Sequence, residues 1–193
     1  RPLVERAERE GLLEASQFLD LLATLQAAGQ LQKALQRLDA TYPMMQRLIP
    51  GLHPLVPLQQ AITRCIGPQG EVLDSASPHL AAVRSEIYAL QNRLGERMQA
   101  LLGRYRTHLQ EGIITQRQGR YVLAVKSGSK RSVPGLVHDH SASGATLYVE
   151  PLEIVELGNE LREVELEEQE EVRRILDGHE DHQDIPPDQH PQD

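Results

Sequence analysis

The residues of this chain that could do chemistry gather in its middle, where basic side chains outnumber acids. Between Arg104 and Arg131 the sequence has seven Arg and Lys residues and one acid, Glu111, so this stretch carries a net charge of +6. Cations at this density suit the phosphates of a nucleic acid, which they contact without distinguishing bases. The candidate contact residues flank one predicted hairpin: Arg117, Arg120, Lys126, Lys130 and Arg131. A solvated basic loop without a ligand is the alternative.

Few aromatic side chains accompany these cations. Only Tyr121 and Tyr148 lie close to them in the sequence, and bases of a single strand bind by stacking on aromatic rings. We therefore expect contact with the backbone of a duplex or a structured nucleic acid. Such contact is predicted to be weak, independent of base sequence and strongly sensitive to salt.

Other chemistries find less support. Residues 127–132 combine Ser, Gly and Lys but lack the second Gly and the spacing of a phosphate-binding P-loop. His138 and His140 share one face of an extended strand, while Asp139 points away, so a metal pair is a weak alternative. The segment around Ser143 lacks the first Gly of the Gly-x-Ser-x-Gly motif that forms a nucleophile elbow. The sequence thus predicts no catalytic residue, no metal site and no cofactor-binding residue in this chain.

The composition limits the fold and the class of protein. The chain has 193 residues, 39% of them hydrophobic and only 3% aromatic, which favours packing of helix on helix. A single cysteine, Cys65, excludes disulfide scaffolds and zinc ribbons and favours a cytoplasmic setting. No apolar run is long enough to span a membrane, so no membrane contact is expected. Because the chain does not begin with Met, we expect an excised piece of a longer protein.

Helical spacing dominates both ends of the chain. Residues 1–38 predict a helical hairpin or short bundle punctuated at Gly29, and prolines break residues 41–78 into short pieces with one helix over 55–66. Ser77 is a predicted N-cap ahead of Pro78. Apolar residues then recur every three or four positions from residue 80 to 109 and again from 154 to 175, which predicts two long helices.

Between these helices the helical period breaks. Residues 120–126, 135–138 and 146–149 predict short strands, and residues 127–129 a turn. The predicted fold is mainly α: a helical core with two long antiparallel lever helices and a small β clamp inserted at their tip. The predicted parts are a partial core (1–78), a first lever helix (79–112), a β clamp (113–150), a returning lever helix (151–176) and a disordered tail (177–193).

Several of these segments resemble one known family. The runs over residues 74–78, 119–126, 133–151 and 155–161 are similar to the middle of the second bacterial MutS paralogue family, and the resemblance covers roughly residues 1–176. The resemblance implies a homodimeric parent ATPase that uses ATP and Mg, carries a C-terminal Smr nuclease domain, and has its active sites outside these residues. This chain by itself is then not an enzyme.

The resemblance also implies a partner. The family binds branched or duplex DNA and suppresses recombination, and in some bacteria it splits collided ribosomes, so a clamp that grips rRNA is the alternative function. The resemblance also implies that Arg120, Lys126, Lys130 and Arg131 contact nucleic acid. From Asp177 the sequence departs from the family pattern. We also expect apolar surface within residues 1–38 and 41–78 to support self-association as a homodimer.

Overall fold

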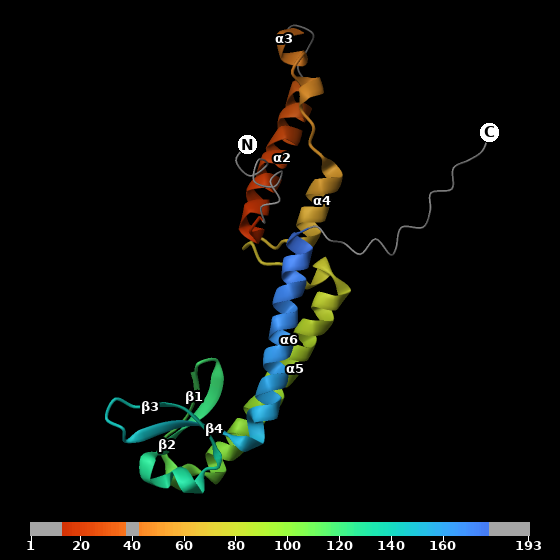
Figure 1. The fold of residues 1–193 in the computed structure, drawn as a ribbon. Coiled ribbons are helices and arrows are strands. Elements are labelled where there is room, and N and C mark those ends of the chain that lie inside the picture. The colour runs from red at the N-terminus through yellow and green to blue at the C-terminus, as the bar shows by residue number, and fades with distance from the viewer. Residues whose placement is uncertain (1–12, 38–42, 178–193) are drawn as a thin grey trace, which may run out of the picture. The chain divides into compact units, whose positions relative to one another are not determined.

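The computed structural model describes residues 13–37 and 43–177, so nearly all of the predicted tail (177–193) lies outside the described residues. The described helices are α2 (Ala15–Gln36), α3 (Pro43–Gln46), α4 (Val56–Cys65), α5 (Pro78–Arg104) and α6 (Leu152–Leu176). The described strands are β1 (Leu109–Arg117), β2 (Arg120–Lys126), β3 (Gly135–His140) and β4 (Thr146–Pro151). Figure 1 shows these elements along the chain. The chain divides into two compact units. The first is Arg1–Ala81 together with Glu170–Asp193, and the second is Ala82–Gln169.

The first unit is helical. Four buried aliphatic residues form its core, and Phe18 and Leu22 of α2 and Val172 of α6 pack against them. These four are Ile62, Ile66, Val72 and Leu80. Burial of such side chains contributes about 1.5–3 kcal/mol each. The core therefore joins segments that are far apart in the sequence.

Gly29 does not interrupt the first helix. The expected hairpin break there is wrong, because α2 continues through Gly29 to Gln36. A Cβ added at Gly29 would lie 3.3 Å from the Cβ of Pro54, so the missing side chain lets another segment approach the helix. Glycine costs about 1 kcal/mol in a helix relative to alanine, which does not by itself end one.

The predicted N-cap at the start of α5 is confirmed. The Ser77 hydroxyl accepts a hydrogen bond of 2.9 Å from the amide of Leu80. The same hydroxyl donates to Glu171 on α6 over 2.5 Å, and both side chains are buried. Glu171 also accepts two hydrogen bonds of 2.8 Å from Arg174. A cap that serves one helix thus also contacts the end of another.

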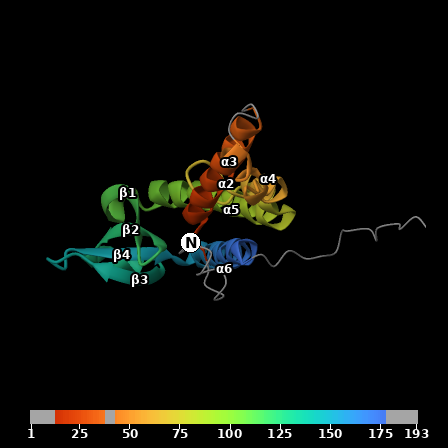
Figure 2. The ribbon, with the colours of Figure 1, turned by 90° about the horizontal axis from the view of Figure 1, so that it is seen from above.

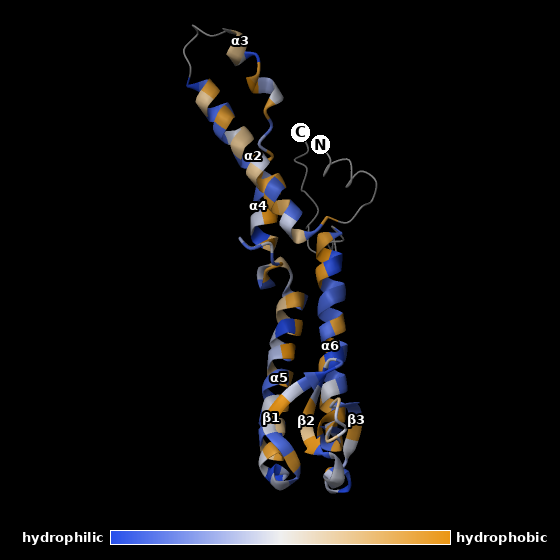
Figure 3. Ribbon diagram, turned by 90° about the vertical axis from the view of Figure 1, so that its left-hand side faces the viewer, coloured by the Kyte–Doolittle hydropathy of each residue, from blue (hydrophilic) through white to orange (hydrophobic). Residues whose placement is uncertain are grey.

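The second unit combines a sheet with parts of two helices. The strand order is β1-β2-β4-β3, every neighbouring pair is antiparallel, and Figure 2 shows the strands in this order. One buried cluster joins the sheet to the helices, with Leu94 and Met98 from α5, Leu123 and Val149 from the sheet, and Ile154 from α6. In Figure 3 hydrophobic residues recur along α5 and α6 among hydrophilic ones, as amphipathic helices require.

The predicted fold class is wrong. The chain is not a mainly α pair of lever helices with a small clamp, because a four-stranded antiparallel sheet accounts for much of the second unit and makes the fold mixed α and β. The misjudged position is Leu109, which continues the helical spacing from Tyr105. Instead α5 ends at Arg104, and Leu109 is buried as the first residue of β1. A regular spacing of apolar residues predicts which side chains are buried. It does not predict where the helix ends when the following strand buries a residue at the next position of that spacing.

Membrane insertion finds no support in the described helices. None of them combines the length and the apolar character that a membrane-spanning helix requires.

Candidate nucleic-acid interface

Arg120 is half-buried and is held by partners within the second unit. Its guanidinium donates to the Oδ1 of Asn159 on α6 over 2.6 Å and lies 3.5 Å from the carboxylate of Glu150. Glu150 is buried, with 1% of its side chain exposed, and its other oxygen lies 2.6 Å from the Nε2 of His138. A buried carboxylate needs such partners because desolvation disfavours its charge. Arg120 therefore belongs to a network around the buried Glu150 that joins β2, β3, β4 and α6.

Arg117 is also engaged within the sheet. Its Nε lies 3.5 Å from a carboxylate oxygen of Asp139, and its guanidinium lies 4.1 Å from the centre of the Tyr148 ring. A further hydrogen bond of 2.8 Å reaches the carbonyl of Gln116. These contacts compensate its charge and reduce its availability to a phosphate.

Among the described residues, neither Lys126 nor Lys130 has an acidic partner. The ammonium of Lys126 donates to the carbonyl of Thr107 over 3.1 Å, and that of Lys130 donates to the carbonyl of Gly135 over 2.9 Å. Carbonyls are neutral acceptors, so these bonds direct the side chains without cancelling their charge. Both lysines flank or lie in the 3₁₀ turn Ser127–Ser132, which begins where β2 ends.

Two arginines complete this cationic surface. Arg131 lies on the same turn, is exposed, and has no ion pair or hydrogen bond among the described residues. The hydrogen bond from Lys126 to Thr107 joins the end of β2 to the 3₁₀ turn Arg106–His108. Arg106 on that turn is likewise exposed. Arg106 belongs to the basic stretch of the sequence but was not among the candidate residues. We call Arg106, Lys126, Lys130 and Arg131 the basic turn surface.

Arg104, the remaining arginine of this stretch, is paired. Its guanidinium lies 2.6 Å from the carboxylate of Glu153. Hydrogen bonds to Tyr105 and Glu153 raise the pKa of Arg104 above its ordinary value. Its charge is thus partly offset by a neighbouring acid.

The polar residues at the end of β3 and in the turn after it form no cluster of three metal-ligating side chains among the described residues. The imidazole of His138 is hydrogen-bonded to Glu150, and the rest of the described residues hold no such cluster either. The Ser143 hydroxyl lies 3.3 Å from that of Ser141 and accepts from the amide of Ala145. These bonds are typical of a turn whose hydroxyls satisfy backbone groups.

The similar proteins found by comparison with known proteins share the name endonuclease MutS2. No protein-family model matches the chain. Endonuclease MutS2 of Synechocystis sp. is 42% identical over 171 residues, which cover 89% of this chain and 21% of the relative. The endonuclease MutS2 of Thermomicrobium roseum is 40% identical over 179 residues (91% and 23%), and that of Symbiobacterium thermophilum is 42% identical over 177 residues (91% and 22%).

The extent of these matches defines what the chain corresponds to. It spans about a fifth of the length of the relatives, while about nine-tenths of the chain itself is matched. The resemblance predicted from the sequence is therefore confirmed: this chain is similar, over almost its whole length, to one segment of the MutS2 family.

Proposed function

We propose that this chain is a nucleic-acid-contacting segment of a MutS-type ATPase and endonuclease that acts on DNA. The relatives' name, endonuclease MutS2, supports the class of the whole protein. In this proposal the ATP- and Mg-dependent chemistry and the strand cleavage belong to other segments, and this segment supplies contact with the substrate.

One observation carries the proposal. The basic turn surface has four cations at two adjoining turns, and none of them has an acidic partner among the described residues. Uncompensated cations release counterions from a phosphate backbone, whereas Arg117 and Arg120 already face carboxylates. The candidate contact set therefore narrows to Lys126, Lys130 and Arg131 and gains Arg106.

The geometry favours backbone contact over base recognition. The ring of Tyr148 is already covered by the guanidinium of Arg117, so it does not present a free stacking face on that side. With about four phosphate contacts we expect weak binding whose logarithm falls with the logarithm of salt at a slope near −3.6. Linear duplex and branched DNA are the ligands of first choice, and structured RNA tests the ribosomal alternative.

The test measures salt-resolved binding of the chain to a linear duplex, a four-way junction and a structured RNA. The variant Lys126→Gln/Lys130→Gln/Arg131→Gln is expected to lose most of the binding at every salt concentration. The matched control, Arg37→Gln/Arg47→Gln/Arg173→Gln, removes the same net charge from exposed arginines on other segments and is expected to retain it.

The ligand preference then separates the two functions. Tighter binding to the junction supports a role on recombining DNA, and tighter binding to RNA supports the ribosomal role. If the wild-type chain does not bind at low salt, or if both triple variants lose binding equally, the proposed contact surface is wrong.

A further inference from the structure

Residues 110–113 of β1 bulge out of the sheet. The flanking residues, Leu109 and Ile114, pair with two residues of β2 between which only Ala124 lies, so four residues of β1 face one residue of β2. All four are exposed, and a Cβ added at Gly112 would meet no atom within 4 Å. We call residues 110–113 the β1 bulge, and it is open to solvent.

The β1 bulge presents an apolar side chain to solvent. Ile113 is 51% exposed, although isoleucine in a strand ordinarily packs against neighbouring side chains. Regular pairing would place Ile113 opposite Ala124 and its side chain on the same face as that buried residue. Because the bulge takes Ile113 out of regular pairing, its side chain remains available to a ligand.

The β1 bulge adjoins the basic turn surface. β1 is an edge strand, and the bulge follows Leu109, which pairs with the residue before Lys126. The bulge spans the level of Ala124, which is two residues, or about 7 Å along the strand, from Lys126. An exposed aliphatic side chain and a set of cations thus lie near the same end of β2.

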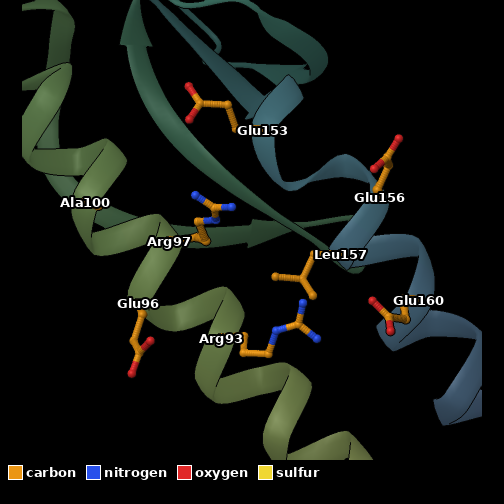
Figure 4. A pocket seen from close by; sticks show the side chains of 8 residues that line it. All are labelled: Arg93, Glu96, Arg97, Ala100, Glu153, Glu156, Leu157 and Glu160. Carbon is orange, nitrogen blue, oxygen red and sulfur yellow. The ribbon is translucent and has the colours of Figure 1, made fainter.

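Other cations of the second unit do not extend this surface. A groove of about 550 Å³ between α5 and α6 is lined by Arg93 and Arg97, but Glu96, Glu156 and Glu160 line it too. Figure 4 shows these acids on both helices around the two arginines. Because acids outnumber arginines there, the groove offers a polyanion no net attraction. The edge of the sheet therefore remains the contact site.

Cations beside an exposed aliphatic side chain suit a protein that deforms DNA. Such proteins hold the phosphates with Lys and Arg and insert Ile, Leu, Met or Phe between base pairs, which unstacks the step and bends the duplex. On the basis of the proposed nucleic-acid contact, we infer that Ile113 is a wedge that enters a base step of duplex DNA held by the basic turn surface.

The polar residues of the β1 bulge fit contact with bases rather than with the backbone. Glu111 repels phosphates, so the bulge itself is a poor backbone contact. The side-chain amide of Gln110 has both a donor and an acceptor for base edges in a groove. The bulge thus combines a wedge with a polar group that can satisfy the bases beside it.

The wedge gives the chain a preference that phosphate contacts lack. Pyrimidine–purine steps such as TA are kinked and unstacked at lower cost than other steps. We therefore expect a duplex that contains TA steps to bind roughly threefold more tightly than one without them. Cations that contact only phosphates carry no such sequence information.

The test uses a short DNA duplex with 2-aminopurine, a base whose fluorescence rises on unstacking, beside a central TA step. Saturation with wild type should raise the fluorescence by roughly twofold or more. Ile113→Ser should keep the salt slope of binding but leave the fluorescence near that of free DNA, and Ile113→Leu should retain the rise. The matched control Leu136→Ser removes an exposed aliphatic side chain from β3, the other edge strand, and should behave like wild type.

The outcomes separate this inference from the proposed function. Salt-sensitive binding without a fluorescence rise, or an equal rise with Ile113→Ser, overturns the wedge alone and is what a bulge that only protects an edge strand predicts. A rise on an RNA duplex of the same sequence but not on DNA also overturns it. Absence of binding overturns both proposals. Circular dichroism checks that each variant folds, and Ile113→Ala replaces Ile113→Ser if the latter does not.

Discussion

The two ends of strand β2 carry the same charge and use it differently. Arg120 at its start is held by Glu150 and Asn159, whereas Lys126 at its end donates only to a neutral carbonyl. The presence of a carboxylate partner separates the two ends: the buried Glu150 lies beside Arg120, while no acid contacts Lys126 among the described residues. A basic residue in the sequence is thus a candidate for binding only when the fold leaves its charge uncompensated.

The same comparison holds for two carboxylates. Glu150 and Asp139 each lie 3.5 Å from an arginine, but Glu150 has 1% of its side chain exposed and Asp139 has 46%. Water screens the exposed pair, so its contribution to stability is small, whereas the buried pair depends on each partner. These paired sites allow the contribution of burial to be measured at equal distance.

The largest expected effect comes from Glu150→Gln. Removal of the buried charge leaves Arg120 without its carboxylate, and we expect the free energy of unfolding to fall by about 3 kcal/mol. The isosteric change Asp139→Asn should cost less than about 0.5 kcal/mol. Urea denaturation of both variants measures the difference, and equal losses would show that burial does not separate the two pairs.

Glu171 extends the comparison to the first unit and to pH. Hydrogen bonds from Arg174 and then from Ser77 lower the pKa of Glu171 to about 2 in the folded chain, from 4.5 ordinarily. The stabilisation is therefore present above pH 4.5 and is lost as pH falls toward 2. Allowing for screening, we expect this loss to reach about 2 kcal/mol.

Denaturation at pH 7 and at pH 3 tests this assignment. Wild type should lose more stability between these two pH values than Glu171→Gln, which has no carboxylate to protonate and should be less stable already at pH 7. Identical pH dependence in the two proteins would show that Glu171 is not responsible.

A smaller effect is expected in the salt dependence of nucleic-acid binding. Lys126→Gln should reduce the slope of the logarithm of affinity against the logarithm of salt by about 0.9, because one phosphate contact is lost. Arg117→Gln should leave the slope unchanged, since Asp139 and Tyr148 already engage that guanidinium. Equal changes in both variants would remove the distinction between compensated and uncompensated cations.

The smallest effect is expected at Gly158 in α6. A Cβ there would lie 3.1 Å from an Arg120 nitrogen and 3.2 Å from a Glu150 oxygen. Alanine favours the helix by about 1 kcal/mol over glycine, but the arginine must move slightly to admit it. We expect Gly158→Ala to change stability by less than about 0.5 kcal/mol. In an Arg120→Gln background part of the helical gain should appear, because the arginine contact is removed while the Glu150 contact remains. Thermal unfolding of the four proteins would measure the coupling.

The sequence by itself determined the local features whose signals lie within a few residues. Ser77 was identifiable as an N-cap because a hydroxyl ahead of a proline satisfies exposed helix amides without any distant partner. The strand over residues 120–126 matched β2 because β-branched residues and a following turn determine it locally. The family resemblance likewise depended on the order of residues alone.

Only the tertiary structure decided where each element ended and which charges were compensated. Leu109 kept the helical spacing but became the start of a strand, because pairing with Val125 satisfied its backbone in a sheet. Arg117 and Arg120 resembled Lys126 and Lys130 in the sequence, yet Asp139 and Glu150 on other strands compensated the arginines alone. Burial and charge compensation depend on residues distant in the chain, and spacing along the sequence does not contain that information.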